Sequence, residues 1–341
     1  MSAQELAATA AAMVAKGKGI LAIDESGATI KKRFDSIALE CTEESRRAYR
    51  DLLITNPGDR DFISGMILFD ETIKQATSAG IAFPQALIAK GIMPGIKVDA
   101  GAKELARHPG ELVTEGLDGL RERLAKYKAL GAKFAKWRAV ITIGPGIPSR
   151  GCVEANAHAL ARYAGLCQEA GIVPMVEPEV LMDAENTIDR CYEVTEMTLR
   201  TLFNELVAQR VSLEHTILKT NMVVSGKLCK TQAGMAEIAE KTVGCLKRAV
   251  PAPIPGIVFL SGGQSGLEAT RNLNAMNAGC DLPWPLSFSY GRALQADALK
   301  AWGGKAENLA QARKVLLHRE RCNGLAAMGK YSQTIEDELA T

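Results

Sequence analysis

The sequence carries almost no net charge and no long apolar run. Its 41 Lys and Arg residues nearly balance 39 Asp and Glu residues, which leaves a formal net charge of +2. This balance gives no electrostatic case for a nucleic-acid or membrane partner. No apolar stretch reaches the roughly 20 residues that span a bilayer, and the N-terminus lacks a signal-peptide pattern. We therefore expect a cytoplasmic protein with neither partner.

Cysteine and histidine occur, but not in metal-binding or redox patterns. The eight cysteines are irregularly spaced without a C-x-x-C pair, which predicts free, mostly buried thiols rather than a disulfide scaffold. The four histidines show no ligand spacing, so we expect no metal site. The histidines are His108, His158, His215 and His318, and the cysteines are Cys41, Cys152, Cys167, Cys191, Cys229, Cys245, Cys280 and Cys322.

Nucleotide-binding motifs are also missing. The chain contains no G-x-x-x-x-G-K-[ST] loop and no G-x-G-x-x-G turn between a predicted strand and helix. Neither ATP nor NAD is indicated, and we expect no cofactor. What remains is an ordinary globular composition, 47% hydrophobic and 23% charged, with enough apolar material for a large core.

Short apolar runs alternate with longer amphipathic stretches along most of the chain. The runs, typical of buried strands, cover residues 19–24, 63–70, 91–98, 132–143, 172–180, 216–221, 256–261 and 286–292. Helical spacing occurs at 46–55, 119–130, 156–170, 189–209 and 235–250. Strict alternation implies parallel strands joined by right-handed crossovers.

Eight such units predict an α/β fold, a (β/α)8 TIM barrel, with an open doubly wound sheet as the alternative. We expect a single catalytic domain over residues 1–341, with a short N-terminal helix and a short C-terminal tail from about residue 331.

Ionisable residues interrupt these apolar runs near their C-terminal ends. Burying an unpaired charge costs several kcal/mol, so charges at these positions indicate ion pairs or a functional site. Residues two apart in a strand share a face, and catalytic residues of TIM barrels gather at the C-terminal mouth. The pattern predicts a polar site formed by Asp24, Lys97, Lys136, Arg138, Glu177, Glu179, Lys219 and Arg292.

Lys219 is the most specific of these residues. It lies in T-I-L-K-T-N, a predicted buried strand in which a solvent-exposed lysine is not expected. Burial and a neighbouring cation such as Lys136 lower a lysine pKa and favour the neutral amine that attacks a carbonyl. Taken singly, Asp24 could be a helix cap or salt-bridge partner, Glu179 a supporting residue and Lys97 a structural or substrate-charge contact.

Two glycine-containing turns predict a phosphate site. Ser261, Gly262 and Gly263 follow the seventh run and precede a predicted helix, whose N-terminus favours anions. Gly291 and Arg292 follow the eighth run, and the guanidinium suits phosphate oxygens. TIM barrels often bind phosphate with these two loops. Pyridoxal phosphate is one interpretation, but charges at several strand ends fit a sugar phosphate better.

Seven motifs resemble those of the class I fructose-bisphosphate aldolases, over about residues 5 to 331. They are G-K-G-I-L-A-I-D-E-S (17–26), G-I-K-V-D (95–99), F-A-K-W-R (134–138), V-E-P-E (176–179), L-K-T-N-M-V (218–223), F-L-S-G-G-Q-S (259–265) and F-S-Y-G-R-A-L-Q (288–295). The resemblance implies metal-independent cleavage of fructose 1,6-bisphosphate in glycolysis and gluconeogenesis, and a homotetramer.

The resemblance also implies roles for individual residues. Lys219 matches the imine-forming lysine, Glu177 the acid/base of carbinolamine dehydration, and Asp24 the carboxylate that takes the C4 hydroxyl proton. Lys136 matches a lysine that balances charge, with Glu179 and Arg138 in support. The C1-phosphate site matches Ser261, Gly262, Gly263, Gly291 and Arg292, whereas Ser26 and Lys97 match contacts to the other phosphate.

The sequence departs from the family pattern in two places. D-E-S-G-A-T replaces the usual D-E-S-T-G-S, so Thr29 stands where a phosphate-contacting serine is common. No tyrosine follows Tyr331, although eukaryotic members end in one that assists proton exchange. The sequence also allows two other functions. The protein could be an aldolase that prefers another sugar, or a barrel that binds sugar phosphates but has lost catalytic activity.

Overall fold

The structure, a computed structural model, describes residues 3–279 and 282–339 of the 341-residue chain. Across the described residues, eight parallel strands close into a barrel in the order β1-β10-β9-β8-β7-β6-β3-β2. They are β1 (Gly19–Ala22), β2 (Ile63–Leu68), β3 (Met93–Lys97), β6 (Phe134–Ile141), β7 (Val173–Val180), β8 (Ile217–Thr220), β9 (Ile257–Phe259) and β10 (Leu286–Tyr290). Each lies within a predicted run. The TIM barrel is confirmed, and the open sheet is wrong.

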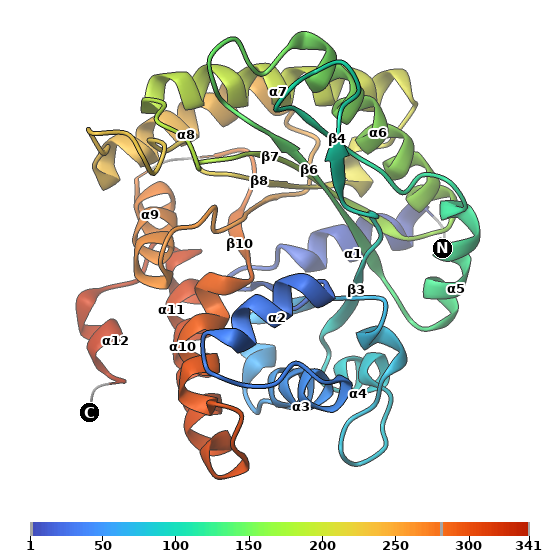
Figure 1. Cartoon of the computed structure of the whole chain (residues 1–341), viewed down its shortest axis with the longest axis vertical. Helices are drawn as coiled ribbons and strands as arrows, with labels where there is room; N and C mark the ends of the chain where they lie inside the picture. The colour runs from blue at the N-terminus through green and yellow to red at the C-terminus, as the bar shows by residue number, and fades with distance from the viewer. Residues whose placement is uncertain (1–2, 280–281, 340–341) are drawn as a thin grey trace.

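Helices surround this barrel (Figure 1). They are α1 (Ala3–Met13), α2 (Gly27–Asp35), α3 (Glu43–Ile54), α4 (Phe83–Ala89), α5 (Leu120–Ala129), α6 (Arg150–Glu169), α7 (Ile188–Ala208), α8 (Met235–Ala249), α9 (Gly266–Ala278), α10 (Arg292–Trp302), α11 (Leu309–Ala326) and α12 (Gln333–Asp337). The antiparallel pair β4 (Ala102–Glu104) and β5 (Leu112–Thr114) forms a separate small sheet. No described helix is both long and apolar enough to cross a bilayer.

Inward-facing side chains change character along each strand. On β7, Met175 belongs to the apolar cluster inside the barrel, whereas Glu177, two residues later, is a buried carboxylate. On β8, Ile217 is followed by the buried Lys219 in the same way. Because alternate residues of a strand share a face, one inward stripe is apolar at the N-terminal end of the barrel and charged toward the other end.

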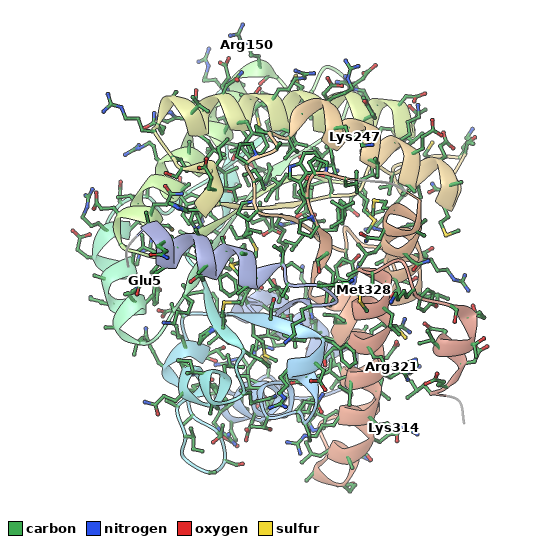
Figure 2. The ribbon with its side chains drawn as sticks, turned by 180° about the vertical axis from the view of Figure 1, so that it is seen from behind. Glu5, Arg150, Lys247, Lys314, Arg321 and Met328 are labelled. Atoms are coloured by element: carbon green, nitrogen blue, oxygen red, sulfur yellow. The ribbon has the colours of Figure 1, made fainter. Side chains whose placement is uncertain are left out.

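Helix α1 closes the N-terminal end of the barrel. Its Leu6, Ala10 and Met13 pack in the same cluster as Ile217 and Phe134 from the barrel interior. Figure 2, seen from behind, shows this helix lying across the barrel, with Glu5 near its start. The interior below the charged layer is therefore filled with side chains, and the site opens only toward the C-terminal ends of the strands.

The phenyl ring of Phe134 explains two glycines of this interior. A Cβ added at Gly95 would lie 2.2 Å from the ring, and one added at Gly65 would lie 2.8 Å from it. Any larger residue there would force the ring out of its place. The glycines of β2 and β3 thus make room for one large residue of β6.

The described cysteines are free thiols, as predicted. Cys152, Cys167, Cys191, Cys245 and Cys322 are buried, and Cys41 and Cys229 are half-buried. Cys280 lies outside the described residues.

Two buried carboxyl groups outside the barrel interior share one cation. Asp59 and Glu320 of α11 are both fully buried, and the Lys90 ammonium lies 2.8 Å from Asp59 Oδ2. Burial raises the pKa of Asp59 to about 6 despite Lys90. Burial, together with the nearby Asp59 charge, raises the pKa of Glu320 well above its usual range. The folded protein therefore keeps a proton here that the unfolded chain releases.

This pair predicts that stability falls as pH rises. From about pH 4 the unfolded carboxyls ionise while the folded pair retains protons. The unfolding free energy therefore drops by up to about 1.4 kcal/mol per pH unit for each proton retained, until the folded pKa values are passed, near pH 6 for Asp59. Glu320→Gln should remove much of this slope and be more stable than wild type at pH 8. Denaturant unfolding between pH 4 and pH 8 measures it, with exposed Glu240→Gln as the control. Equal slopes for wild type and Glu320→Gln would contradict the prediction.

Candidate active site

A cavity of about 740 Å³ opens at the C-terminal ends of the barrel strands. Every site residue predicted from the sequence lines it. These residues are Asp24, Ser26, Thr29, Lys97, Lys136, Arg138, Glu177, Glu179, Lys219, Ser261, Gly262, Gly263, Gly291 and Arg292. Residues from seven barrel strands or the loops after them therefore converge on one space.

The Glu177 carboxylate lies between two lysines at the centre of the cavity. Its Oε1 is 3.0 Å from Lys219 Nζ, and its Oε2 is 3.4 Å from Lys136 Nζ. Lys136 Nζ also lies 2.8 Å from Asp24 Oδ2. The four groups form a chain of alternating charge, which explains how the barrel tolerates charges that are almost completely buried.

This arrangement fixes the charges of two members of the chain. Burial alone would raise the pKa of Asp24, but the ammonium groups of Lys136 and Lys219 outweigh it and lower the pKa to about 2. Burial alone would lower the pKa of Lys136, but the carboxylates of Asp24 and Glu177 hold it above its ordinary value. Asp24 is thus an anion able to accept a proton, and Lys136 a permanent cation.

Asp99 also belongs to this group of charged residues, although the sequence analysis did not predict it as a site residue. It is 3% exposed at its side chain, and its carboxylate lies 2.7 Å from Lys97 Nζ and 4.0 Å from Lys136 Nζ. It also accepts hydrogen bonds from the backbone amides of Gly101 and Arg138. The signal was present, because Asp99 follows Lys97 by two residues and so continues the same face of the strand.

Arg138 and Glu179 form an ion pair beside this chain. Glu179 is mostly buried, whereas the Arg138 side chain is 43% exposed. The two residues that share a strand face with Lys136 and Glu177 thus bind each other across β6 and β7, which keeps both strands in register at the cavity wall.

The loop between β9 and α9 presents backbone rather than side chains. Gly262 and Gly263 have φ values of 55° and 85°, in the left-handed region that favours glycine. Ser265 then caps α9 by accepting from the Glu268 amide, and Glu268 bonds back to Ser265. This geometry places the backbone of Gly262 and Gly263 and the N-terminus of α9 beside the cavity, an arrangement suited to an anion.

A second group of residues reaches the cavity from α2. The hydroxyls of Ser26 and Thr29 lie 3.2 Å apart at the start of this helix. Arg33, also on α2, lines the cavity and forms an ion pair with the buried Glu25. Glu25 is bound on its other oxygen by Arg50, at 2.7 Å. Strand patterns could not reveal Arg33, because it approaches from a helix outside the barrel.

Comparisons with known proteins agree over nearly the whole chain. Residues 5–341 match the family model described as fructose-bisphosphate aldolase class-I. The chain is 62% identical over 332 residues to a probable fructose-bisphosphate aldolase class 1 of Xanthomonas axonopodis pv. citri, covering 97% of this chain and 99% of that one. It is 52% identical to the fructose-bisphosphate aldolase of Dictyostelium discoideum, covering 97% and 93%.

A solved structure gives the same result for the fold. The Plasmodium falciparum fructose-bisphosphate aldolase, crystallised in complex with TRAP and a small-molecule inhibitor, superposes with a TM-score of 0.95. It is 49% identical in sequence, and the match covers 96% of this chain and 95% of that chain.

Proposed function

The chain belongs to the class I fructose-bisphosphate aldolase family, and we propose that Lys219, Glu177 and Asp24 carry out its chemistry. The enzyme is a lyase of glycolysis and gluconeogenesis that reversibly cleaves fructose 1,6-bisphosphate to dihydroxyacetone phosphate and glyceraldehyde 3-phosphate. The observation that best supports these roles is the position of the Glu177 carboxylate, which lies within 3.4 Å of both Lys219 Nζ and Lys136 Nζ.

Lys219 begins the reaction by attacking the ketose carbonyl carbon C2. Its ammonium first loses a proton, and the Glu177 oxygen at 3.0 Å is placed to accept it. The amine adds to C2, and the resulting carbinolamine loses water after Glu177 returns a proton to the leaving hydroxyl. A protonated imine remains, with Lys136 as a fixed cation that assists the addition.

Asp24 then starts the cleavage of the C3–C4 bond. Its carboxylate takes the proton of the C4 hydroxyl, the bond electrons move into the imine as an enamine, and the aldehyde is released. Protonation of the enamine and addition of water free dihydroxyacetone phosphate and restore the lysine. We propose that Glu179 and Arg138 keep Glu177 and Lys136 in position, and that neither a metal nor another cofactor takes part.

The two phosphate groups are proposed to bind at opposite sides of the cavity. Ser261, Gly262 and Gly263 with Gly291 and Arg292 would hold the C1 phosphate through backbone amides and a guanidinium. Ser26, Thr29 and Lys97 would contact the other phosphate. Thr29 keeps the hydroxyl of the serine that is usual at this position in the family, so the contact is retained.

Borohydride reduction in the presence of dihydroxyacetone phosphate tests the proposal directly. Reduction should convert the imine into a stable secondary amine, and peptide mapping should find the adduct on Lys219. Activity should persist in EDTA. An active enzyme that takes no label, or one that chelation inactivates, would refute the proposed chemistry.

Arg292 provides a separate test of the C1-phosphate site. Its charged hydrogen bonds to phosphate should be worth about 1.5–3 kcal/mol, so Arg292→Ala should raise KM for fructose 1,6-bisphosphate about 10- to 100-fold with a smaller change in kcat. Steady-state kinetics measures the effect. Arg190→Ala, an exposed arginine of α7 paired with Glu193, serves as the control. A wild-type KM in Arg292→Ala would remove this residue from the site.

We also propose a cytoplasmic homotetramer. The location is supported by the spinach relative named as a cytoplasmic isozyme, which is 52% identical over 330 residues. The tetramer rests on the family resemblance, and light scattering after size-exclusion chromatography would measure it.

A further inference from the structure

Three side chains of metal-ligand type meet outside the active-site cavity, between α11 and α12. They are His318 and Cys322 of α11 and Glu336 of α12, and their ligand atoms all lie within 4.8 Å of one another. His318 is 8% exposed and Cys322 is fully buried, whereas Glu336 is half-buried. In Figure 1, α12 lies beside α11 on the outside of the barrel. None of the three residues lines the active-site cavity.

The spacing of His318 and Cys322 suits a shared ion. Residues four apart lie on the same face of a helix, and here Cys322 Sγ is 3.5 Å from His318 Nε2. A tetrahedral zinc ion with bonds of about 2.3 Å to sulfur and 2.0–2.1 Å to nitrogen holds these two atoms about 3.5 Å apart. The Cys322 sulfur and the His318 nitrogen therefore already have the separation that zinc requires.

The third ligand is held in place by its own partners. Glu336 accepts from both Nη atoms of Arg319 and from Tyr331 Oη at 2.8 Å. A carboxylate has about four lone-pair sites. Oε2 accepts from Arg319 Nη1 and Tyr331, whereas Oε1 accepts only from Arg319 Nη2, so Oε1 keeps a lone pair for an ion. The Arg319 charge opposes a cation, but the Cys322 thiolate and the Glu336 carboxylate together supply two negative charges against it.

We propose that His318, Cys322 and Glu336 form a zinc site with three protein ligands and water in the fourth position. Thiolate and imidazole ligands favour zinc over calcium or magnesium. On binding, the Cys322 thiol releases its proton to solvent and the sulfur bonds to the ion. The ion joins α12 to α11 across the loop between them. The histidine pattern alone could not indicate this site, because its other ligands are a cysteine and a distant glutamate.

Titration of the metal-stripped full-length protein with Co²⁺ and then Zn²⁺ tests the proposal. Wild type should bind about one Co²⁺ per chain with a thiolate-to-cobalt charge-transfer band that Zn²⁺ abolishes. Cys322→Ser should lose the band, and His318→Gln should weaken binding at least about tenfold. Cys245→Ser is the matched control, because Cys245 is also fully buried but lies on α8 outside the cluster.

Thermal unfolding gives a second measurement. Zinc should raise the Tm of wild type and of Cys245→Ser through binding to the folded state, but not the Tm of Cys322→Ser. A wild type without the cobalt band, or equal binding by the two serine variants, would overturn the proposal. Because sugar cleavage uses none of these residues, its rate should be the same in stripped and zinc-loaded enzyme, and a failure of either idea leaves the other intact.

Discussion

Lys219→Met is expected to lower kcat for fructose 1,6-bisphosphate cleavage by about 10⁴-fold or more, because the nucleophile of the first covalent step is gone. Methionine is similar in length to lysine and fills the same buried space. Glu177 keeps its contact with Lys136, 3.4 Å away, so its carboxylate is not left without a cation. The loss should therefore come from chemistry rather than from unfolding, and circular dichroism should show a folded barrel.

The Lys219→Arg variant distinguishes the role of Lys219 as a nucleophile from its role as a cation beside Glu177. Arginine keeps a cation beside Glu177 but stays protonated and forms no imine under these conditions, so activity and borohydride labelling should both be lost. Lys247→Met, an exposed lysine of α8 labelled in Figure 2, should behave as wild type. Cleavage at the wild-type rate in Lys219→Met would show that the reaction does not pass through this amine.

Glu177→Gln should have the second-largest effect, a fall in kcat of about 10²- to 10⁴-fold, the range for loss of a general acid–base group. The amide is nearly isosteric, but it can neither take the proton of Lys219 nor return one to the carbinolamine. It also leaves the two ammonium groups facing a neutral side chain. Single-turnover kinetics should place the loss in imine formation, with borohydride labelling of Lys219 slowed to a similar degree.

The control for this variant is Glu193→Gln, an exposed residue of α7 that pairs with Arg190. It should change neither the cleavage rate nor the labelling rate. If Glu177→Gln formed the imine at the wild-type rate, then Glu177 would not be the group that transfers protons at Lys219, and a water or another carboxylate would have to do so.

The sequence alone predicted the barrel and the residues of its mouth because both depend on local patterns. Strands buried on two faces are continuous apolar runs, so Lys136 or Glu177 within such a run is conspicuous. Helix α11 was missed for the opposite reason. Its buried side includes polar residues such as Arg319, Glu320 and Asn323, which obscure the apolar periodicity on which helix prediction relies.

Pairing between the site residues could not be predicted in the same way. The strand pattern gave the positions of Lys136 and Lys219 but suggested that they act on each other as neighbouring cations. In the structure the Glu177 carboxylate contacts both, because β7 lies between β6 and β8 in the barrel. Arg33 and Arg50 come from helices outside the barrel, where no strand periodicity could indicate them.

Because helix α1 covers the N-terminal end of the barrel, substrates and products can pass only through the opening at the C-terminal ends of the strands. Lys219 is 4% exposed and lies deep, whereas Arg292 is exposed at the rim. In the proposed reaction, cleavage leaves one fragment bound covalently to the Lys219 amine and the other free, and both must leave through the same opening. The free aldehyde must therefore depart first and the tethered ketone last. In the synthetic direction the ketone must bind before the aldehyde. The order of substrate binding and product release therefore follows from the single opening of the active-site cavity.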